Sequence, residues 1–471
     1  MHELTLSQIA EITGGQLFGD GAIVLRNIAI DSRQSMDAAL FAAIIGQRVD
    51  GHDFATQALQ NGAAACLTSR PVAGAHVLVE RADDQLDPVI SALGLIAAFQ
   101  RSRLVGVNVV GITGSSGKTS TKDIIGQVLQ AHGLTQSPAG SMNNELGLPL
   151  TILSAPDAVE NLVLEMGMRG LGHIEYLCRI GRPNIAVVTN VGQAHIGEVG
   201  TIENIALAKS EIVRGLNNDD WAVLNQDDPR VIEMRSATAA KVRTYGASDE
   251  SDIRALNIEV CADGTYEFDV RVLDEEAHIT LPLLGAHNIS NALAAVAVGT
   301  IVGMSLSDIA QALAHVKLVS SWRMEKSVTA NGVTLINDAY NANPESMAAA
   351  LKTLVGLAPS GHSWAVLGAM GELGESSIEQ HDAIGRLAVR LDVSHLVVVG
   401  QSAKALHLGA TQEGSWDGES VWFPDFTSAC DYIVERVNAP DVVLFKASRA
   451  GRFEELAQLV ATSLNADWSA Q

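Results

Sequence analysis

Short apolar runs that end in polar residues recur through the middle of this chain. The runs 161–165, 185–189 and 221–225 each finish on polar side chains, and an apolar run at 105–112 precedes them. Strands that alternate with helical stretches are typical of a parallel sheet, whose functional side chains gather at the carboxyl ends of the strands. We therefore expect a parallel α/β sheet in this region.

The flanking parts of the chain have patterns of their own. The beginning predicts a small α/β unit, with helices at 4–12 and 55–61 and strands at 23–30, 39–45, 64–68 and 76–79. Residues 253–284 alternate apolar and polar positions, which predicts antiparallel strands, and an alanine-rich helix follows at 285–299. Beyond Trp322 the alternation of strands and helices restarts, with strands near 333–338, 363–368, 395–400 and 441–446.

Length and composition agree with several α/β domains. A chain of 471 residues corresponds to about three domains. Hydrophobic residues make up 47% of the chain but aromatic residues only 4%, so Ala, Val, Leu and Ile must fill the cores. We expect a small N-terminal α/β domain at 1–83, a central parallel-sheet domain at 84–320 and a C-terminal Rossmann-like, doubly wound domain at 321–471.

Charge and cysteine content exclude several functional classes. The net charge of -23 repels phosphate backbones, so we expect no nucleic-acid partner. The four cysteines form no zinc-type spacing and are expected to be reduced. Neither a signal peptide nor an apolar run of about 18 residues is present, so we expect a cytoplasmic protein with no membrane segment.

The strongest chemical signal is a glycine loop between a strand and a helix. It runs Gly111-Ile112-Thr113-Gly114-Ser115-Ser116-Gly117-Lys118-Thr119, followed by Ser120. Backbone N–H groups of such a loop converge on phosphate oxygens, the lysine adds positive charge, and the threonine hydroxyl is suited to Mg²⁺. The first glycine stands one residue earlier than in the strict pattern. The loop predicts ATP as ligand and makes the central domain a P-loop domain, but it serves kinases, ATPases and ligases alike.

Three further polar residues follow strands or lie on a helix of the same domain. Glu165 ends an apolar strand, where a carboxylate is able to hold Mg²⁺ beside bound phosphates, although a surface glutamate is an equal alternative. His195 follows the next strand, and Lys209 lies on a helix that begins near Ile202. Taken alone, a structural histidine and a solvated lysine are the commoner interpretations.

Together these residues resemble the Mur ligase family along the whole chain. The resemblance implies that Lys118 and Thr119 hold ATP, that Glu165 and Thr119 bind one Mg²⁺, and that His195 with a carbamylated Lys209 serves a second. The helix start Gly285-Ala286-His287-Asn288 resembles the family segment in which Asn288 contacts adenine. Arg323 matches an arginine that reaches the terminal phosphate, and Asp338 an aspartate that holds the ribose. The resemblance names Lys118, His195, Lys209 and Arg323 as the catalytic group.

Other tracts distinguish among members of the family. Residues 337–346, which include Tyr340 and Asn341, and the tract 141–149, which includes Asn143 and Asn144, resemble the members that add D-alanyl-D-alanine to UDP-MurNAc-tripeptide. The Asp-Asn-Pro-Arg motif of the tripeptide-forming members is absent. The N-terminal tracts resemble the surface that binds the UDP-sugar, with Ser32, Arg33, Gly46, His52 and Phe54 as its candidate residues. The C-terminal candidates for substrate contacts are Lys446, Ser448 and Arg449, although Ala447 replaces the family's glycine.

The implied reaction is formation of an acyl phosphate from ATP and the tripeptide carboxylate, followed by attack of the dipeptide amine, in peptidoglycan synthesis. The resemblance also implies a monomer that closes its domains around the substrates. Three alternatives stay open, and one of them is another ligase of the same family. Folylpolyglutamate synthetase shares the central fold, but it lacks a long domain before the phosphate loop. A P-loop kinase or regulatory ATPase would turn over ATP without requiring an amine.

Overall fold

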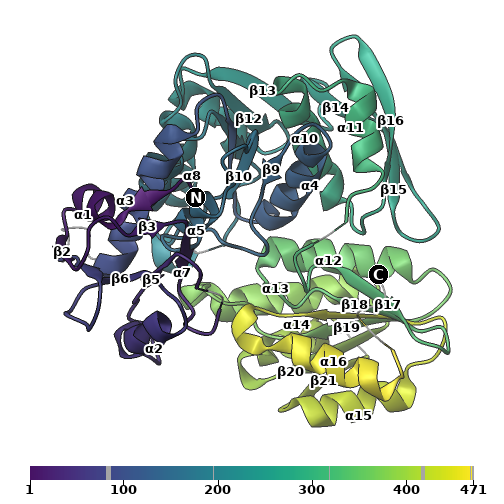
Figure 1. The fold of residues 1–471 in the computed structure, drawn as a ribbon. Coiled ribbons are helices and arrows are strands. Elements are labelled where there is room, and N and C mark those ends of the chain that lie inside the picture. Colours follow the sequence, from purple (N-terminus) through teal and green to yellow (C-terminus); the bar gives the residue numbers. More distant parts are fainter. Residues whose placement is uncertain are drawn as a thin grey trace.

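A computed structural model describes residues 1–34, 36–80, 86–194, 196–317, 319–414, 419–466 and 468. Three sheets of five, nine and six strands follow one another along the chain, and a two-stranded sheet accompanies the first. Figure 1 shows the corresponding three units, the first in purple, the central one in blue and teal, and the third in green and yellow. This α/β architecture is the one that the sequence predicts.

The first unit is built on a five-stranded sheet in the order β2-β7-β6-β5-β4. Its elements are β1 (Leu4–Thr5), α1 (Leu6–Thr13), β2 (Gln16–Phe18), β3 (Val24–Leu25), β4 (Asn27–Ala29), β5 (Ala39–Ala42), α2 (Ala55–Gln60), β6 (Ala65–Thr68) and β7 (His76–Leu78). The predicted limit between the first two domains, at residues 83 and 84, lies outside the described residues.

Two predictions in the first unit are wrong in detail. The expected strand 23–30 is divided at Arg26, because β3 pairs antiparallel with β1 whereas β4 pairs parallel with β5. The expected helix 4–12 begins two residues later for the same reason, since Leu4 pairs with Leu25. Thr5 then caps α1 by accepting from the N–H of Gln8, which ends the strand and starts the helix.

The central sheet has the order β16-β15-β14-β13-β12-β11-β8-β10-β9. Its strands are β8 (Asn108–Thr113), β9 (Thr135–Gln136), β10 (Asn161–Glu165), β11 (Ile185–Val188), β12 (Trp221–Asn225), β13 (Lys241–Gly246), β14 (Ile253–Val260), β15 (Tyr266–Val272) and β16 (Glu275–Leu281). Strands β8 to β14 form the parallel part of the sheet. Strands β14 to β16 form the antiparallel extension that the alternating pattern predicts. The expected strand start at Val105 is wrong, because that side chain lies in a turn and is 89% exposed.

Helices cover both faces of the central sheet. One core contains α4 (Lys118–Gln130), α10 (His287–Ile301) and α11 (Leu306–Leu313). The opposite core contains α3 (Pro88–Arg103), α5 (Gly147–Leu153), α6 (His173–Gly181) and α8 (Ile202–Arg214), with the short α7 (Ile196–Val199) and α9 (Pro229–Ile232) nearby. The second core also includes residues of the first unit, so α3 joins the two units through shared apolar packing.

The third unit is a doubly wound sheet in the order β17-β18-β22-β19-β20-β21. Its strands are β17 (Glu325–Val328), β18 (Thr334–Asn337), β19 (Ser363–Leu367), β20 (His395–Val399), β21 (Ser420–Phe423) and β22 (Val442–Lys446). One face packs against α12 (Pro344–Leu357), α13 (Ser377–Arg390) and α14 (Lys404–Glu413), the other against α15 (Phe426–Arg436) and α16 (Phe453–Ser463). β17 alone runs antiparallel to its neighbour.

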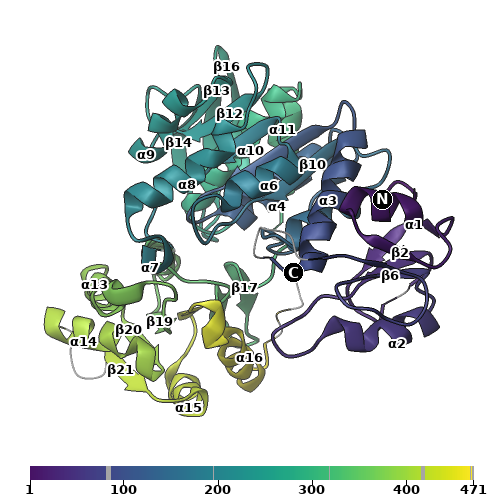
Figure 2. The ribbon, with the colours of Figure 1, turned by 90° about the vertical axis from the view of Figure 1, so that its left-hand side faces the viewer.

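The third unit lies beneath the central one, and a view from the side shows α7 reaching toward it (Figure 2). Backbone atoms meet there, since the N–H of Gly197 donates to the carbonyl of Glu372 over 3.1 Å.

Among the helices that the structure describes, none is both long and apolar enough to cross a membrane.

Candidate functional site

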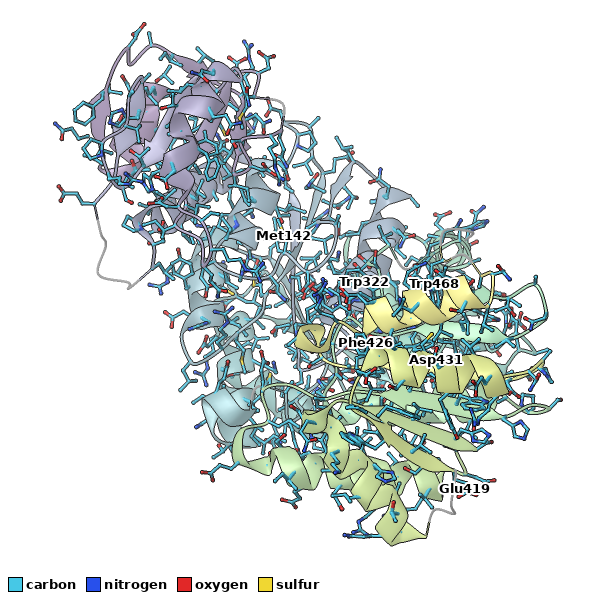
Figure 3. The ribbon with its side chains drawn as sticks, turned by 90° about the horizontal axis from the view of Figure 1, so that it is seen from below. Met142, Trp322, Glu419, Phe426, Asp431 and Trp468 are labelled. Atoms are coloured by element: carbon cyan, nitrogen blue, oxygen red, sulfur yellow. The ribbon has the colours of Figure 1, made fainter. Side chains whose placement is uncertain are left out.

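A cleft of about 500 Å³ opens between the central and third units. It is lined by the phosphate loop, the ends of β10 and β11, the start of α10, the linker before β17, the start of α12 and the ends of β18 and β22. Figure 3, seen from below, labels Met142 and Trp322 near the middle of the molecule, where the ribbons of the two units meet. The cleft therefore lies at the carboxyl ends of strands from two sheets, as expected for a ligand site in α/β folds.

The phosphate loop has a backbone that only glycine tolerates. Gly114 has a φ of 155°, and a Cβ there would lie 1.8 Å from Thr189 Oγ1. Gly117 has a φ of 77° and directly precedes α4. The loop is held from the neighbouring strand end, because the Ser116 N–H donates to Asn190 Oδ1 over 2.9 Å. This bracing presets the loop before a ligand arrives.

The free donors of the loop are at the start of α4. The first turn of a helix has no intrahelical acceptors for its N–H groups, which here belong to residues 117–120. The positive end of the helix dipole points the same way. Lys118 bends back over the loop, where its Nζ donates to the Gly114 carbonyl over 2.8 Å. Withdrawal from water lowers the pKa of Lys118, and Glu165 opposes this shift.

Glu165 is the centre of a polar cluster on the floor of the cleft. It is wholly buried at the end of β10. Its Oε2 accepts from Thr119 Oγ1 over 2.9 Å, and its Oε1 accepts from Ser141 Oγ over 2.8 Å and from Asn143 Nδ2 over 2.7 Å. The structure therefore brings together four residues from three separate sequence motifs.

The donor set around Glu165 fits a hard divalent cation. None of the described residues forms an ion pair with this buried carboxylate, and a buried charge is costly without a compensating partner. Carboxylate and hydroxyl oxygens are the ligands that Mg²⁺ prefers. The Glu165–Thr119 pair thus provides hard oxygens beside the phosphate loop.

Lys209 faces inward from α8 and is 1% exposed. Burial, and to a lesser extent the charge of Lys118, lower the pKa of Lys209 well below its ordinary value. Its helix neighbour Glu211 accepts from the N–H groups of Gly172 and Glu175 at 2.7 and 3.0 Å, which caps α6 and holds α8 in place. His195 lies outside the described residues, so its predicted role stays a prediction.

Arg323 enters the cleft from the linker between the central and third units. Its Nη2 donates to Thr119 Oγ1 over 2.9 Å, and its guanidinium lies 4.1 Å from the ring centre of Tyr340. The residues on both sides, Trp322 and Met324, have φ values of 60° and 51°. Non-glycine residues adopt this left-handed conformation only where surrounding contacts impose it. The linker is therefore held in a strained form that presents Arg323.

Asp338 supports this linker from the end of β18. Its Oδ1 accepts from the Met324 N–H over 3.2 Å, and its Oδ2 accepts from Lys446 Nζ over 2.5 Å. Lys446 also donates to the carbonyl of Asn341 over 3.0 Å. Both charges line the cleft. These hydrogen bonds do not test the predicted contact of Asp338 with the ribose, which stays a prediction.

Asn288 is placed differently from the other nucleotide candidates. It is fully buried, donates to the Leu284 carbonyl and accepts from Asn291 Nδ2. His287, Ser290 and Asn291 of the same helix line the cleft, whereas Asn288 lies behind them. Its predicted contact with adenine stays a prediction.

The remaining candidates of the cleft fall into two groups. Asn144, Asn341 and Arg449 line it, and the Arg449 guanidinium packs over Trp322. Ser448 is buried, its N–H donates to the Ala369 carbonyl, and it does not line the cleft.

The N-terminal candidates form a separate group on the first unit. Arg33 is exposed and pairs with Asp31, whose pKa this hydrogen bond lowers to about 2. His52 is buried, where its Nδ1 bonds Asp50 and its Nε2 accepts from the Ser69 N–H, so its ring fixes the loop to the end of β6. None of the predicted N-terminal residues lines the cleft: Ser32, Arg33, Gly46, His52 and Phe54.

Sequence reasoning missed several residues that shape the cleft. Glu345, in the first turn of α12, accepts from the Gln193 N–H over 2.8 Å and so joins the third unit to the central one. Asn190 braces the phosphate loop. In the sequence, Asn190 is marked only by its position after a strand. Glu345 is marked only by its position after the proline that starts a helix. His381 is buried, and its Nε2 accepts from the Met370 N–H, which shapes the loop that contacts Gly197.

Three family models match successive parts of the chain. The Mur ligase family catalytic domain matches residues 24–103, the Mur ligase middle domain residues 112–299, and the Mur ligase glutamate ligase domain residues 322–449. Together the three matches span most of the chain.

Full-length relatives agree with these matches. The UDP-N-acetylmuramoyl-tripeptide–D-alanyl-D-alanine ligase of Mycobacterium tuberculosis is 41% identical and covers 96% of each chain. A crystal structure of MurF from Acinetobacter baumannii superposes with a TM-score of 0.88 at 31% identity, covering 98% of this chain and 99% of the other. MurF ligase from Thermotoga maritima, solved in complex with ADP, has a TM-score of 0.81 at 30% identity, covering 93% of this chain and 98% of its own.

Proposed function

This chain belongs to the Mur ligase family, and we propose that it joins D-alanyl-D-alanine to UDP-N-acetylmuramoyl-tripeptide at the expense of ATP. The products are the UDP-linked pentapeptide, ADP and phosphate. The proposal draws its substrates from the Mycobacterium tuberculosis relative named above, a UDP-N-acetylmuramoyl-tripeptide–D-alanyl-D-alanine ligase that is similar to 96% of this chain.

The observation that carries the proposal is the meeting of three groups at Thr119. This residue starts the phosphate helix, its hydroxyl donates to Glu165, and the same oxygen accepts from Arg323 of the opposite unit. A phosphoryl group bound at the helix start would therefore face a carboxylate suited to Mg²⁺ on one side and a guanidinium on the other. Such a site is suited to stabilising charge on a transferring phosphoryl group.

In the first step, a carboxylate oxygen of the tripeptide attacks the γ-phosphorus of ATP. The new P–O bond forms as the bond to the β-phosphate oxygen breaks, which gives an acyl phosphate and ADP. Two anions approach each other here, so positive charge must offset their repulsion. Lys118 and Arg323 supply it from opposite walls of the cleft, and the N–H groups at the start of α4 bind phosphate oxygens.

In the second step, the dipeptide amine attacks the acyl carbon. The C–N bond forms, the C–O bond to phosphate breaks, and the amine releases a proton. Phosphate is a far better leaving group than oxide, which is why the carboxylate is phosphorylated first. No side-chain nucleophile is required, so the chain's contribution is mainly orientation and charge.

Mg²⁺ belongs to this proposal through Thr119, Glu165, His195 and Lys209. Once bound, Mg²⁺ would supply positive charge beside the phosphates. Lys209 gains the needed negative charge by carbamylation, in which its neutral amine adds to CO₂ and loses a proton. The burial of Lys209 and its lowered pKa support this, because only the unprotonated amine reacts.

The UDP-sugar is proposed to lie on the first unit, where the exposed Arg33 offers a cation. ATP and a nucleotide sugar are cytoplasmic metabolites, so we place the reaction in the cytoplasm, carried out by a monomer.

Phosphate release from ATP and Mg²⁺ tests the proposal, with the tripeptide and D-alanyl-D-alanine each omitted in turn. We expect release only with both substrates, and a product heavier by one dipeptide residue in mass spectrometry. Release without either substrate, or only with a folate acceptor, would contradict the proposed function.

A further inference from the structure

Two charged residues in the second turn of α4 have no part in the proposed reaction. Lys122 is wholly buried, and its neighbour Asp123 is 5% exposed. They form an ion pair, with Lys122 Nζ 2.6 Å from Asp123 Oδ1. Charged side chains are seldom buried unless they are paired, because burial removes their hydration. The two residues contact two different segments of the chain, the loop after β9 and the linker before Arg323.

Lys122 holds the loop that follows β9. Its Nζ donates to the carbonyls of Pro138 and Gly140 at 2.5 and 3.0 Å. Ser141 comes next in the chain, and its hydroxyl donates to Glu165 Oε1. A single peptide unit therefore separates the anchor on Lys122 from the cluster around Glu165.

The same loop is tightly packed, so movement at its anchor is transmitted. A Cβ on Gly147 would lie 2.7 Å from the Cα of Met142, and a Cβ on Gly126 would lie 3.0 Å from Ser137. The loop also supplies Asn143, which donates both to Glu165 and to Ser141. Loss of the Lys122 anchor would displace two of the three donors of the Glu165 carboxylate.

Asp123 holds the linker that carries Arg323. Its Oδ2 accepts from the Ser320 N–H over 3.1 Å, three residues before Arg323. One turn further along α4, the Gln127 amide bonds both the N–H and the carbonyl of Lys317. The linker thus runs along α4 before it turns, through the strained residue Trp322, into the cleft.

We propose that Lys122 and Asp123 are positioning residues that place Glu165 and Arg323 relative to the phosphate loop. The phosphate helix carries Thr119 in its first turn and the Lys122–Asp123 pair in its second. One rigid helix therefore fixes the relative positions of Thr119, Glu165 and Arg323. Lys122 acts through Ser141 and Asn143 on Glu165, and Asp123 acts through Ser320 on Arg323. The inference rests on the proposed binding of ATP and Mg²⁺ in this cleft, and goes beyond it by assigning these two residues.

Removing one member of a buried ion pair leaves an uncompensated charge, so single variants risk failing to fold. The first double variant, Lys122→Met with Asp123→Asn, removes both charges together. Its new amide side chain still offers an oxygen to the Ser320 N–H, so only the anchor of the 138–143 loop is lost. The second double variant, Lys122→Met with Asp123→Ala, loses both anchors.

Arg101→Met is the matched control. Arg101 also donates to three backbone carbonyls, those of Gly181, Leu104 and Arg182, but it lies at the end of α3 and does not line the cleft. It therefore reports the effect of losing a cation that fixes backbone segments, without any link to Glu165 or Arg323.

The experiment is a calorimetric titration of Mg²⁺ and ADP into the full chain, with thermal unfolding measured in parallel. We expect the first double variant to weaken Mg²⁺ binding in the presence of ADP about tenfold, as seen for residues that orient metal ligands. In a separate phosphate-release assay with both substrates, the second double variant should also lower kcat, because Arg323 is freed. Arg101→Met should leave Mg²⁺ binding unchanged.

Equal Mg²⁺ affinity in the first double variant and in the wild type would overturn the inference. Hydrogen exchange on the unmutated protein gives an independent check, since Mg²⁺ with ADP should increase the protection of amides in 138–143, and no change there would also contradict it. Neither the Mg²⁺ titration nor the exchange measurement uses a peptide substrate. A different amine acceptor would therefore refute the proposed function without affecting this result.

Discussion

Arg323 Nη2 donates to Thr119 Oγ1 over 2.9 Å, although 204 residues separate them along the chain. The contact joins the linker of the third unit to the first turn of the phosphate helix. A site completed by residues from two units depends on how those units are arranged. The following expectations test that arrangement.

Replacing Arg323 with lysine should lower kcat by roughly 100-fold or more, because lysine keeps the charge but loses the planar fork and its packing over Tyr340. Phosphate release at saturating substrates measures the effect. Tyr340→Phe keeps an aromatic face and serves as the control for the stacking. A kcat for Arg323→Lys within twofold of the wild type would contradict the assigned role.

Replacing Glu165 with glutamine should raise the Mg²⁺ concentration needed for half-maximal activity by about ten- to 100-fold. The glutamine keeps the size of the side chain but removes the negative charge, and its amide group would face the donors Ser141 and Asn143. Activity measured over a range of Mg²⁺ concentrations checks this. An unchanged Mg²⁺ requirement would exclude Glu165 as a metal ligand.

Lys209 should make stability depend on pH. Its pKa in the folded chain is lowered by burial, whereas it is about 10.4 in the unfolded chain. Between these two values the unfolded state binds a proton that the folded state does not. The free energy of unfolding therefore rises with pH through this window by about 1.4 kcal/mol per pH unit, and the gain is lost as pH falls.

Lys209→Met removes this dependence, so denaturant unfolding of both proteins at several pH values in CO₂-free buffer tests the sign. The wild type should gain stability relative to the variant as pH rises.

The same pair of proteins tests carbamylation of Lys209. Addition of ¹³C-bicarbonate should give a carbamate signal in the NMR spectrum of the wild type alone. A carbamate signal that persists in Lys209→Met would assign the modification to another amine.

The contact between Glu345 and Gln193 should favour the closed arrangement of the two units. Glu345→Ala removes an acceptor whose hydrogen bond contributes about 1.5–3 kcal/mol, so we expect roughly a tenfold or greater loss of kcat/KM. Glu345→Gln keeps an acceptor oxygen and should retain more activity. Small-angle scattering with an ATP analogue and both substrates should show compaction in the wild type and less of it in Glu345→Ala.

Much of the fold follows from local pattern. The strands Asn161–Glu165 and Trp221–Asn225 have the predicted limits, because a buried strand needs only a short apolar run with polar ends. The phosphate loop is equally local, since its glycines, lysine and threonine act within nine consecutive residues. The cleft candidates Lys118, Glu165 and Arg323 could be named for this reason and from the family resemblance.

Pairing and bracing were decided by the tertiary structure alone. The division of the strand 23–30 depends on two different partners, β1 and β5, and one stretch of sequence does not specify which partner each half will find. Asn190 against Ser116, Glu345 against Gln193 and Lys122 against Gly140 join residues far apart in the chain. Apolar periodicity reports whether a side chain is buried, but a polar contact depends on which donor and acceptor the completed fold brings within hydrogen-bond distance.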